Sequence, residues 1–356
     1  MLKSCFSRLT KLSSGNRFLF PALLAALSPA LALAEAPSGD VPPPWAYAVD
    51  PPGVKAPKDD GTLRHVPNST LALTLSQVRD GFVAPDWHPD AHPPLAPIVA
   101  HGRKPEVMAC GYCHRAEGTG GPENASVAGL PAAYIIQQMA DFKSGARSTS
   151  MPERAPQKNM MALAKKLTPA EVEEAAAYFS SLKLRPIMRV IESDMVPETY
   201  VHGWHLANLD NGKKEPIGQR IIEMPEDLEQ FVSRDAHSVF IAYVPPGSIE
   251  KGKVLATTGG GRTIQCTICH GPDLRGLSHI DTAAATGKVD ASVASGFQGP
   301  IPGIAGRSPT YIVRQLFDIQ HGVRAGAGTV LMKPTVEKLT MEDMIDLAAY
   351  ASSLQP

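Results

Sequence analysis

The pattern Cys-x-x-Cys-His occurs twice in this chain of 356 residues, as Cys110-Gly111-Tyr112-Cys113-His114 and as Cys266-Thr267-Ile268-Cys269-His270. Residues three positions apart lie on one face of a helical turn, so both thiols of each copy can bond to one porphyrin edge. The histidine that follows is then held under the iron as its proximal ligand. Each copy is therefore typical of an attachment site for c-type haem, and two haem c groups are predicted.

Three other uses of paired cysteines fit the pattern less well. A structural disulfide is tight with only two residues between its partners, and it gives His114 and His270 no role. A thiol-redox motif usually accompanies a βαβ pattern, which this sequence does not show. A four-thiolate zinc site has pairs separated by about 15–20 residues. The two pairs here are 153 residues apart.

The segments that follow the two motifs repeat each other. Small residues, a tyrosine and a Gly-x-Arg recur at an offset of 177 residues, whereas a Leu-Thr pair and a later tyrosine recur at 172. The matched positions are Ala128-Gly129 with Ala305-Gly306, Tyr134 with Tyr311, Arg147 with Arg324, Leu167-Thr168 with Leu339-Thr340, and Tyr178 with Tyr350. Such self-similarity indicates one supersecondary plan used twice.

Helix signals place both repeats in an α-helical fold. Thr168 and Glu171 have the spacing of a capping box, and Thr340 and Asp343 repeat it. Apolar residues follow each cap at helical spacing. Two further helices are expected over Tyr134–Lys143 and Tyr311–Gln320. Each repeat is thus predicted to be a small all-α unit wrapped around its cofactor.

The ligand on the other side of each iron decides between electron transfer and catalysis. A thioether there closes the metal, whereas water or an open position admits a reactant. Met160 and Met332 each lie seven residues before the Leu-Thr pair of their repeat, so they are the predicted sixth ligands. The alternatives in the first repeat are Met151, Met161 and the upstream histidines His88, His92 and His101.

Further residues are expected to support the haem groups. A proximal imidazole usually donates its second N–H to a backbone carbonyl, and Pro302 is placed to offer one to His270. The aligned residue of the first repeat is Ala125. Arg147 and Arg324 are candidates for ion pairs with the haem propionates, the alternative being that they are solvated.

Composition limits the class of partner. Lys plus Arg number 34 and Asp plus Glu 35, for a net charge of −1, so no basic field exists that could hold a nucleic acid. With 43% hydrophobic residues, the length suits about two domains with buried cores.

The first residues have the form of a secretory signal peptide. A basic stretch without acids precedes an apolar run from Phe18 to Leu33, and small residues precede Glu35. An uncleaved anchor helix is the alternative, but the run is shorter than about 20 residues and contains two prolines. We therefore expect cleavage after Ala34, export to the periplasm, and no transmembrane helix in the mature chain.

Two segments lie outside the repeats, and a third interrupts the second repeat. Residues 35–69 are rich in proline and are expected to run extended along the surface, with Trp45 and Tyr47 as anchors. Residues 185–245 are rich in β-branched and aromatic residues between turn signals, so a small β-rich insert is predicted. The second repeat also carries an additional loop at about 277–298 that suits a haem edge or a partner.

The order of these motifs resembles class I cytochrome c, used twice as in the tandem two-haem periplasmic cytochromes. The resemblance covers about 95–184 and 246–356 and implies all-α domains, covalent haem and His/Met ligation. The expected organisation is a signal peptide (1–34), a proline-rich segment (35–69), a first cytochrome domain (70–184), the insert (185–245) and a second cytochrome domain (246–356). The long insert departs from the family, in which a short linker is usual.

The sequence thus favours a periplasmic two-haem electron carrier rather than an enzyme. A periplasmic dehydrogenase or a quinol-oxidising complex is the expected donor, and a terminal oxidase or reductase the expected acceptor. Two alternatives stay open: a two-haem enzyme acting on peroxide or small sulfur compounds, and a cytochrome subunit of a dehydrogenase complex.

Overall fold

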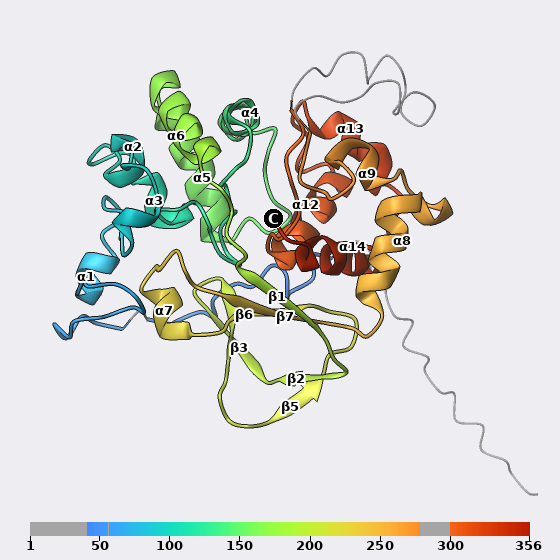
Figure 1. Cartoon of the computed structure of the whole chain (residues 1–356), viewed down its shortest axis with the longest axis horizontal. Helices are drawn as coiled ribbons and strands as arrows, with labels where there is room; N and C mark the ends of the chain where they lie inside the picture. Colours follow the sequence, from blue (N-terminus) through green and yellow to red (C-terminus); the bar gives the residue numbers. More distant parts are fainter. Residues whose placement is uncertain (1–40, 56, 278–299) are drawn as a thin grey trace, which may run out of the picture. The chain divides into compact units, whose positions relative to one another are not determined.

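The computed structural model describes residues 41–55, 57–277 and 300–356. The expected signal peptide lies outside these residues, as does the loop expected at 277–298 except for its first residue. Within the described ranges, no helix combines the length and the apolar character needed to cross a membrane. All of the described residues belong to one compact unit (Figure 1).

The first repeat is a set of helices around the first motif. Its helices are α3 (Cys110–His114), α4 (Ala132–Ser144), α5 (Ala155–Lys166) and α6 (Pro169–Ser181). The hydroxyl of Thr168 accepts from the backbone N–H of Glu171, whose carboxylate accepts from that of Thr168, so α6 begins with the predicted capping box. Phe179 of α6 belongs to an apolar cluster that forms the core of this repeat.

The second repeat has the same order of elements. After α8 (Ser248–Thr258) come α9 (Cys266–His270), α12 (Pro309–Gln320), α13 (Thr329–Val336) and α14 (Met341–Ser353). α12 begins two residues before the expected helix, because the hydroxyl of Ser308 accepts from the backbone N–H of Tyr311. α8 crosses α14 closely at Gly252, where a Cβ would overlap the carbonyl oxygen of Asp346.

The segment between the repeats is β-rich, as the sequence predicts. β1 (Met188–Glu192) pairs in parallel with β7 (Phe240–Val244), and β7 pairs antiparallel with β6 (Ile222–Pro225). Two smaller antiparallel pairs are β2 (Met195–Pro197) with β5 (Lys214–Pro216), and β3 (Thr199–His202) with β4 (His205–Asn208). A short helix, α7 (Leu228–Val232), precedes β7. Figure 1 shows these strands below the helices of both repeats.

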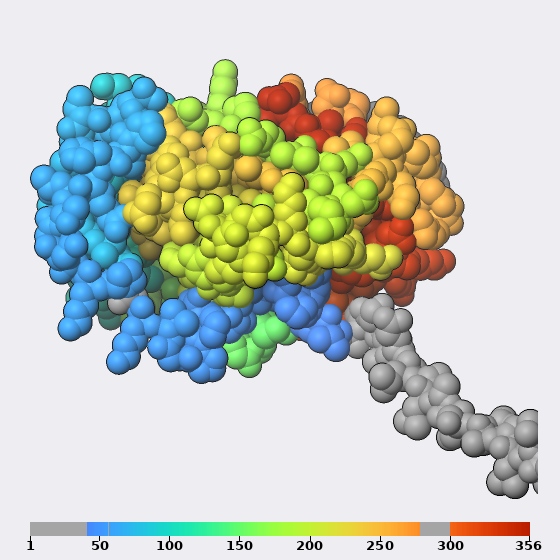
Figure 2. Space-filling model, turned by 90° about the horizontal axis from the view of Figure 1, so that it is seen from below, coloured from blue at the N-terminus to red at the C-terminus, as the bar shows by residue number. Residues whose placement is uncertain are grey.

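The residues before the first motif form short helices and extended chain. The helices are α1 (Leu75–Val78), η1 (Pro89–Ala91) and α2 (Pro97–Ala100). Figure 2 shows this segment in blue beside the insert in yellow.

Within the segment expected to run along the surface, Tyr47 is buried, as expected of an anchor, and its neighbours Ala46 and Ala48 are buried with it. The Tyr47 side chain is 1% exposed, and its hydroxyl donates to the carboxylate of Asp318 at 2.7 Å. The buried guanidinium of Arg314 donates to the Ala46 carbonyl oxygen at 2.7 Å. A proline-rich chain satisfies few of its own carbonyls, and here buried arginines do so, which draws these residues into the core.

Candidate haem site

Both Cys-x-x-Cys-His turns face one cavity of about 620 Å³ between the two repeats. Apolar side chains supply much of its wall, including Leu130, Phe179, Leu316 and Leu347. All four motif cysteines and both motif histidines line it as well. A mainly apolar cavity with a few polar groups is the environment that a porphyrin requires.

The two motif histidines are oriented in the same way. The Nδ1 of His114 lies 2.8 Å from the carbonyl oxygen of Ala125, and the Nδ1 of His270 lies 2.8 Å from that of Pro302. Each imidazole donates through Nδ1, so Nε2 remains for a metal. Burial lowers the pKa of both imidazoles, which favours the neutral form that binds iron. These residues therefore fit a proximal ligand set.

The four cysteines are free thiols. Burial raises the pKa of Cys110 to about 12 and that of Cys266 to about 11, and it also raises the pKa of the second cysteine of each pair. No disulfide joins them, and the four thiols do not gather around one ion: in the described ranges, the only cluster of three or more potential metal ligands is His88, Asp235 and His237. The geometry therefore agrees with covalent attachment better than with a disulfide or a zinc site.

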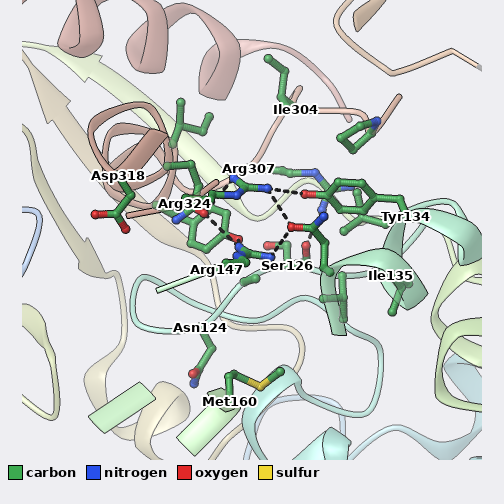
Figure 3. A pocket seen from close by; sticks show the side chains of 18 of the residues that line it. Asn124, Ser126, Tyr134, Ile135, Arg147, Met160, Ile304, Arg307, Asp318 and Arg324 are labelled. Carbon is green, nitrogen blue, oxygen red and sulfur yellow. Dashed lines mark hydrogen bonds between the residues drawn. The ribbon is translucent and has the colours of Figure 1, made fainter. Parts of the chain in front are cut away.

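The candidate methionines also line this cavity. Met160 reaches it from α5 and Met332 from α13. Neither Met151 nor Met161 is among the lining residues; Met151 instead packs against the core of the second repeat. Figure 3 shows Met160 in the cavity wall, apart from the arginines Arg147, Arg307 and Arg324.

The upstream histidines do not reach the cavity wall. His88 Nε2 lies 2.9 Å from a carboxylate oxygen of Asp235, and His92 Nε2 lies 3.0 Å from one of Asp86. His101 is exposed. His88 and His92 therefore take part in polar networks away from the cavity, and none of the three histidines is placed to ligate a haem iron in it.

Arg147 and Arg324 lie at the junction of the repeats and reach across it. Arg147 donates to Gln138 of its own repeat at 2.8 Å, and to Tyr311 and Gln315 of the other at 2.8 and 2.9 Å. Burial would raise the pKa of the Tyr311 hydroxyl, but Arg147 and Arg324 together lower it. A short backbone bridge joins the two arginines.

Arg324 makes the reciprocal set of contacts. It donates to Gln315 at 2.9 Å within its repeat, and to Tyr134 and Gln138 of the first repeat at 3.0 Å each. Each glutamine oxygen thus accepts from both arginines. The buried Nε of Arg324 has no hydrogen-bond partner, so one donor of this cavity-lining residue is left unsatisfied. A buried cationic pair with a spare donor fits acidic groups such as propionates.

The sequence did not indicate Arg307, which joins the two repeats. It is 8% exposed and donates to the carbonyl oxygens of Ser126 at 2.7 Å and Ala128 at 3.2 Å. The aligned residue in the first repeat is Leu130, so this break in the repeat was the available signal. Gly203 and Trp204 of the insert line the cavity too, without any sequence signal for a cofactor contact.

Two Cys-x-x-Cys-His turns facing one apolar cavity, in a mainly helical fold, define a c-type cytochrome. The family model for cytochrome c matches residues 99–183. Cytochrome c-554(548) of Halomonas halodenitrificans is 31% identical over 98 residues, which are 28% of this chain and 94% of that protein. The chain therefore belongs to the cytochrome c family, whose cofactor is covalently bound haem c, and its two repeats make it a tandem class I cytochrome.

Other relatives match the chain over different lengths. Cytochrome c4 of Pseudomonas aeruginosa is 22% identical over 255 residues, covering 70% of this chain and 85% of that protein. The thiosulfate dehydrogenase electron acceptor of Thiomonas intermedia is 36% identical over 90 residues, covering 25% of this chain and 38% of that protein. The crystal structure of reduced cytochrome c4 from Pseudomonas stutzeri is 22% identical, with a TM-score of 0.42, and covers 69% of this chain and 93% of that one.

Proposed function

We propose that this chain carries two haem groups and passes single electrons through them from a donor protein to an acceptor protein. The observation that carries the proposal is that both candidate thioethers, Met160 and Met332, line the same cavity as both motif histidines. An iron with imidazole on one side and thioether on the other has no open position for a reactant. Electron transfer is the chemistry that this ligand set allows.

Each repeat supplies one complete set of groups for a haem. The haem itself provides the one-electron redox couple, while the protein provides attachment, orientation and burial. The first set comprises Cys110, Cys113, His114 and Met160, and the second comprises Cys266, Cys269, His270 and Met332. The carbonyls of Ala125 and Pro302 orient the proximal rings, and apolar side chains line both sites.

Arg147 and Arg324 are proposed to bind haem propionates at the junction of the repeats. Both guanidiniums are buried, and their present partners are neutral glutamines and tyrosines. Two buried cations without a carboxylate partner are costly, and propionate groups would neutralise them. This arrangement would bring the two haem groups close to one another across the junction.

The proposed setting is the periplasm, with a dehydrogenase or a quinol-oxidising complex as donor and a terminal oxidase or reductase as acceptor. The export signal expected in the first 34 residues supports this location. The name of the Thiomonas relative, a thiosulfate dehydrogenase electron acceptor, favours a dehydrogenase of small sulfur compounds as one donor to test.

The test is the optical and magnetic spectrum of the oxidised protein, together with the mass of the intact chain. We expect a mass increment of two haem groups, two low-spin irons and the sulfur-to-iron charge-transfer band from both. A high-spin signal from one iron would instead support the haem enzyme acting on peroxide or sulfur compounds. Stable copurification with a flavin- or quinone-containing chain would support a subunit of a dehydrogenase complex.

A further inference from the structure

The hairpin formed by β3 and β4 ends in an unusual turn. Its two central residues, Gly203 and Trp204, have φ angles of 57° and 75°. Positive φ at both positions suits a two-residue hairpin, but the usual residues there are asparagine, aspartate and glycine. A bulky side chain at positive φ is a strained outlier, and the surroundings must hold it in place.

Two hydrogen bonds hold this turn in place. The backbone N–H of Gly203 donates to the carboxylate of Asp50 at 2.8 Å. The carbonyl oxygen of Trp204 accepts from Arg154 at 3.2 Å, and the same guanidinium donates to Ala48 at 2.6 Å. Arg154 is fully buried at 0% exposure. The turn is therefore fixed to the N-terminal segment and to the first repeat together.

The position of the turn relates it to one haem site rather than to both. Arg154 is the residue that precedes α5, the helix that carries Met160. Gly203 and Trp204 line the cavity together with residues of that helix. The insert's other lining residue, Arg234, donates to the carbonyl oxygen of Tyr112 inside the first motif. Both hydrogen bonds that these lining residues of the insert make to a repeat are thus with the first repeat.

We infer that Trp204 is a wall residue of the first haem site, placed by the insert to keep water from the haem on the side of Met160. The inference rests on the proposed cofactor of that site. Lower solvent access disfavours the more highly charged ferric state, so the indole raises the reduction potential of the first haem. The strained turn positions this side chain at the first haem site. Among the described residues of the insert, none supplies an equivalent side chain to the second repeat.

The decisive variant is Trp204→Gly in the full-length holoprotein. Glycine adopts positive φ without strain, so the turn is retained while the side chain is removed. We expect the ferrous-to-ferric ratio of one haem, at a fixed applied potential, to fall roughly threefold to tenfold, a tenfold change being 59 mV for a one-electron couple. The other haem should be unchanged, and both charge-transfer bands should remain.

Two further variants assign the effect. Met160→Ala identifies the redox wave of the first haem, and Trp204→Gly must move that same wave. Trp204→Phe keeps an aromatic side chain at the position, so its reduction potential should stay close to that of the wild type. Tyr200→Ala is the matched control, because this residue lies on the same hairpin, is 38% exposed and is absent from the cavity wall.

Exogenous imidazole provides a second readout that does not depend on electron transfer to a partner. Its association with the ferric protein should be faster in Trp204→Gly at one haem, because the Met160 side becomes accessible. If Trp204→Gly retained two His/Met haem groups but showed unchanged redox waves and unchanged imidazole binding, this inference alone would be overturned. Absence of those haem groups from the wild type would instead overturn the proposed function.

Discussion

The electron-transfer proposal depends most directly on Met332, whose thioether is the proposed sixth ligand of one iron. Met332→Ala should remove one sulfur-to-iron charge-transfer band, convert that iron to high spin and lower its reduction potential, because the soft ligand that favours ferrous iron is lost. Met160→Ala should do the same at the other haem. Optical spectra and potentiometric titration measure these changes.

The matched control for this prediction is Met161→Ala. Met161 follows Met160 directly on α5 but does not line the cavity. Its substitution should leave both irons low-spin. An unaltered spin state and midpoint potential in Met332→Ala would contradict the proposed ligation.

His205 should make the protein acid-sensitive. Burial lowers the pKa of this imidazole, 4% exposed, to about 4, whereas an unfolded chain titrates near 6.5. Below about pH 6.5 the imidazole becomes protonated in the unfolded state but stays neutral in the folded state. The free energy of unfolding therefore falls by about 3 kcal/mol as the pH is lowered to about 4. Above pH 6.5 this group contributes no pH dependence.

Urea denaturation at several pH values measures this effect. His205→Gln should flatten the slope of unfolding free energy against pH between about 6.5 and 4. The control is His65→Gln, because His65 is exposed. Equal slopes in the wild type and in His205→Gln would show that another group carries the acid sensitivity.

At the scale of single residues, the sequence predicts what the repeat fixes and misses what the insert adds. Ala125 and Pro302 lie at equivalent positions, so the carbonyl partners of both motif histidines follow from alignment of the two copies. Trp204 lines the cavity from a turn that Asp50 and Arg154, each about 50 residues or more away along the chain, hold in place. No local pattern encodes such a contact.

At the scale of elements, the helix caps allow a quantitative test. Thr168→Ala should lower the free energy of unfolding by about 1 kcal/mol, because the hydroxyl accepts from the backbone N–H of Glu171 at the start of α6. Thr340→Ala should have a similar effect at α14. Chemical denaturation measures both.

Thr257→Ala is the control for the caps. Its hydroxyl donates to the carbonyl of Lys253 in the same helix, an interaction that does little for helix stability. A change within about 0.5 kcal/mol is expected. If the cap variants also stayed within that range, the capping boxes would not contribute as argued.

The elements themselves were predictable to different degrees. The capped helices and β1 follow from local signals, namely a cap with helical periodicity and a run of β-branched residues between turns. β6 does not, because it contains Glu223, which is 1% exposed and would be an unfavourable residue for a buried strand by itself. Its carboxylate accepts from Ser308 at 2.8 Å and from the backbone of Thr310 at 3.0 Å, so its burial depends on the second repeat.

At the scale of the whole molecule, the two offsets in the sequence predict two copies of one unit but not their association. The shared cavity depends on arginines that cross between segments: Arg147 and Arg324 between the repeats, and Arg314 from α12 to Ala46 and Pro122. The repeated Gly-x-Arg singles out Arg147 and Arg324 but not the partners they reach, and Arg314 has no distinctive local context. The junction therefore became visible only in three dimensions.

Arg307 makes this junction testable, because it is the residue of the second repeat whose guanidinium satisfies two carbonyls of the first. Arg307→Met keeps an apolar stem but leaves the carbonyl oxygens of Ser126 and Ala128 buried without that donor, a loss of about 3 kcal/mol. The variant also loses the bond from Nε to the Gly303 carbonyl of its own repeat at 2.7 Å, but the other two lost contacts lie between the repeats, so the two repeats should also unfold less cooperatively. We expect one sharp calorimetric transition in the wild-type holoprotein and a split or broadened transition in Arg307→Met.

The control is Arg275→Gln, which removes an exposed guanidinium bonded to the Gln355 carbonyl of the same repeat and should retain one sharp transition. A lower melting temperature with an equally sharp single transition would mean that Arg307 stabilises its own repeat, and that the other crossing arginines carry the coupling.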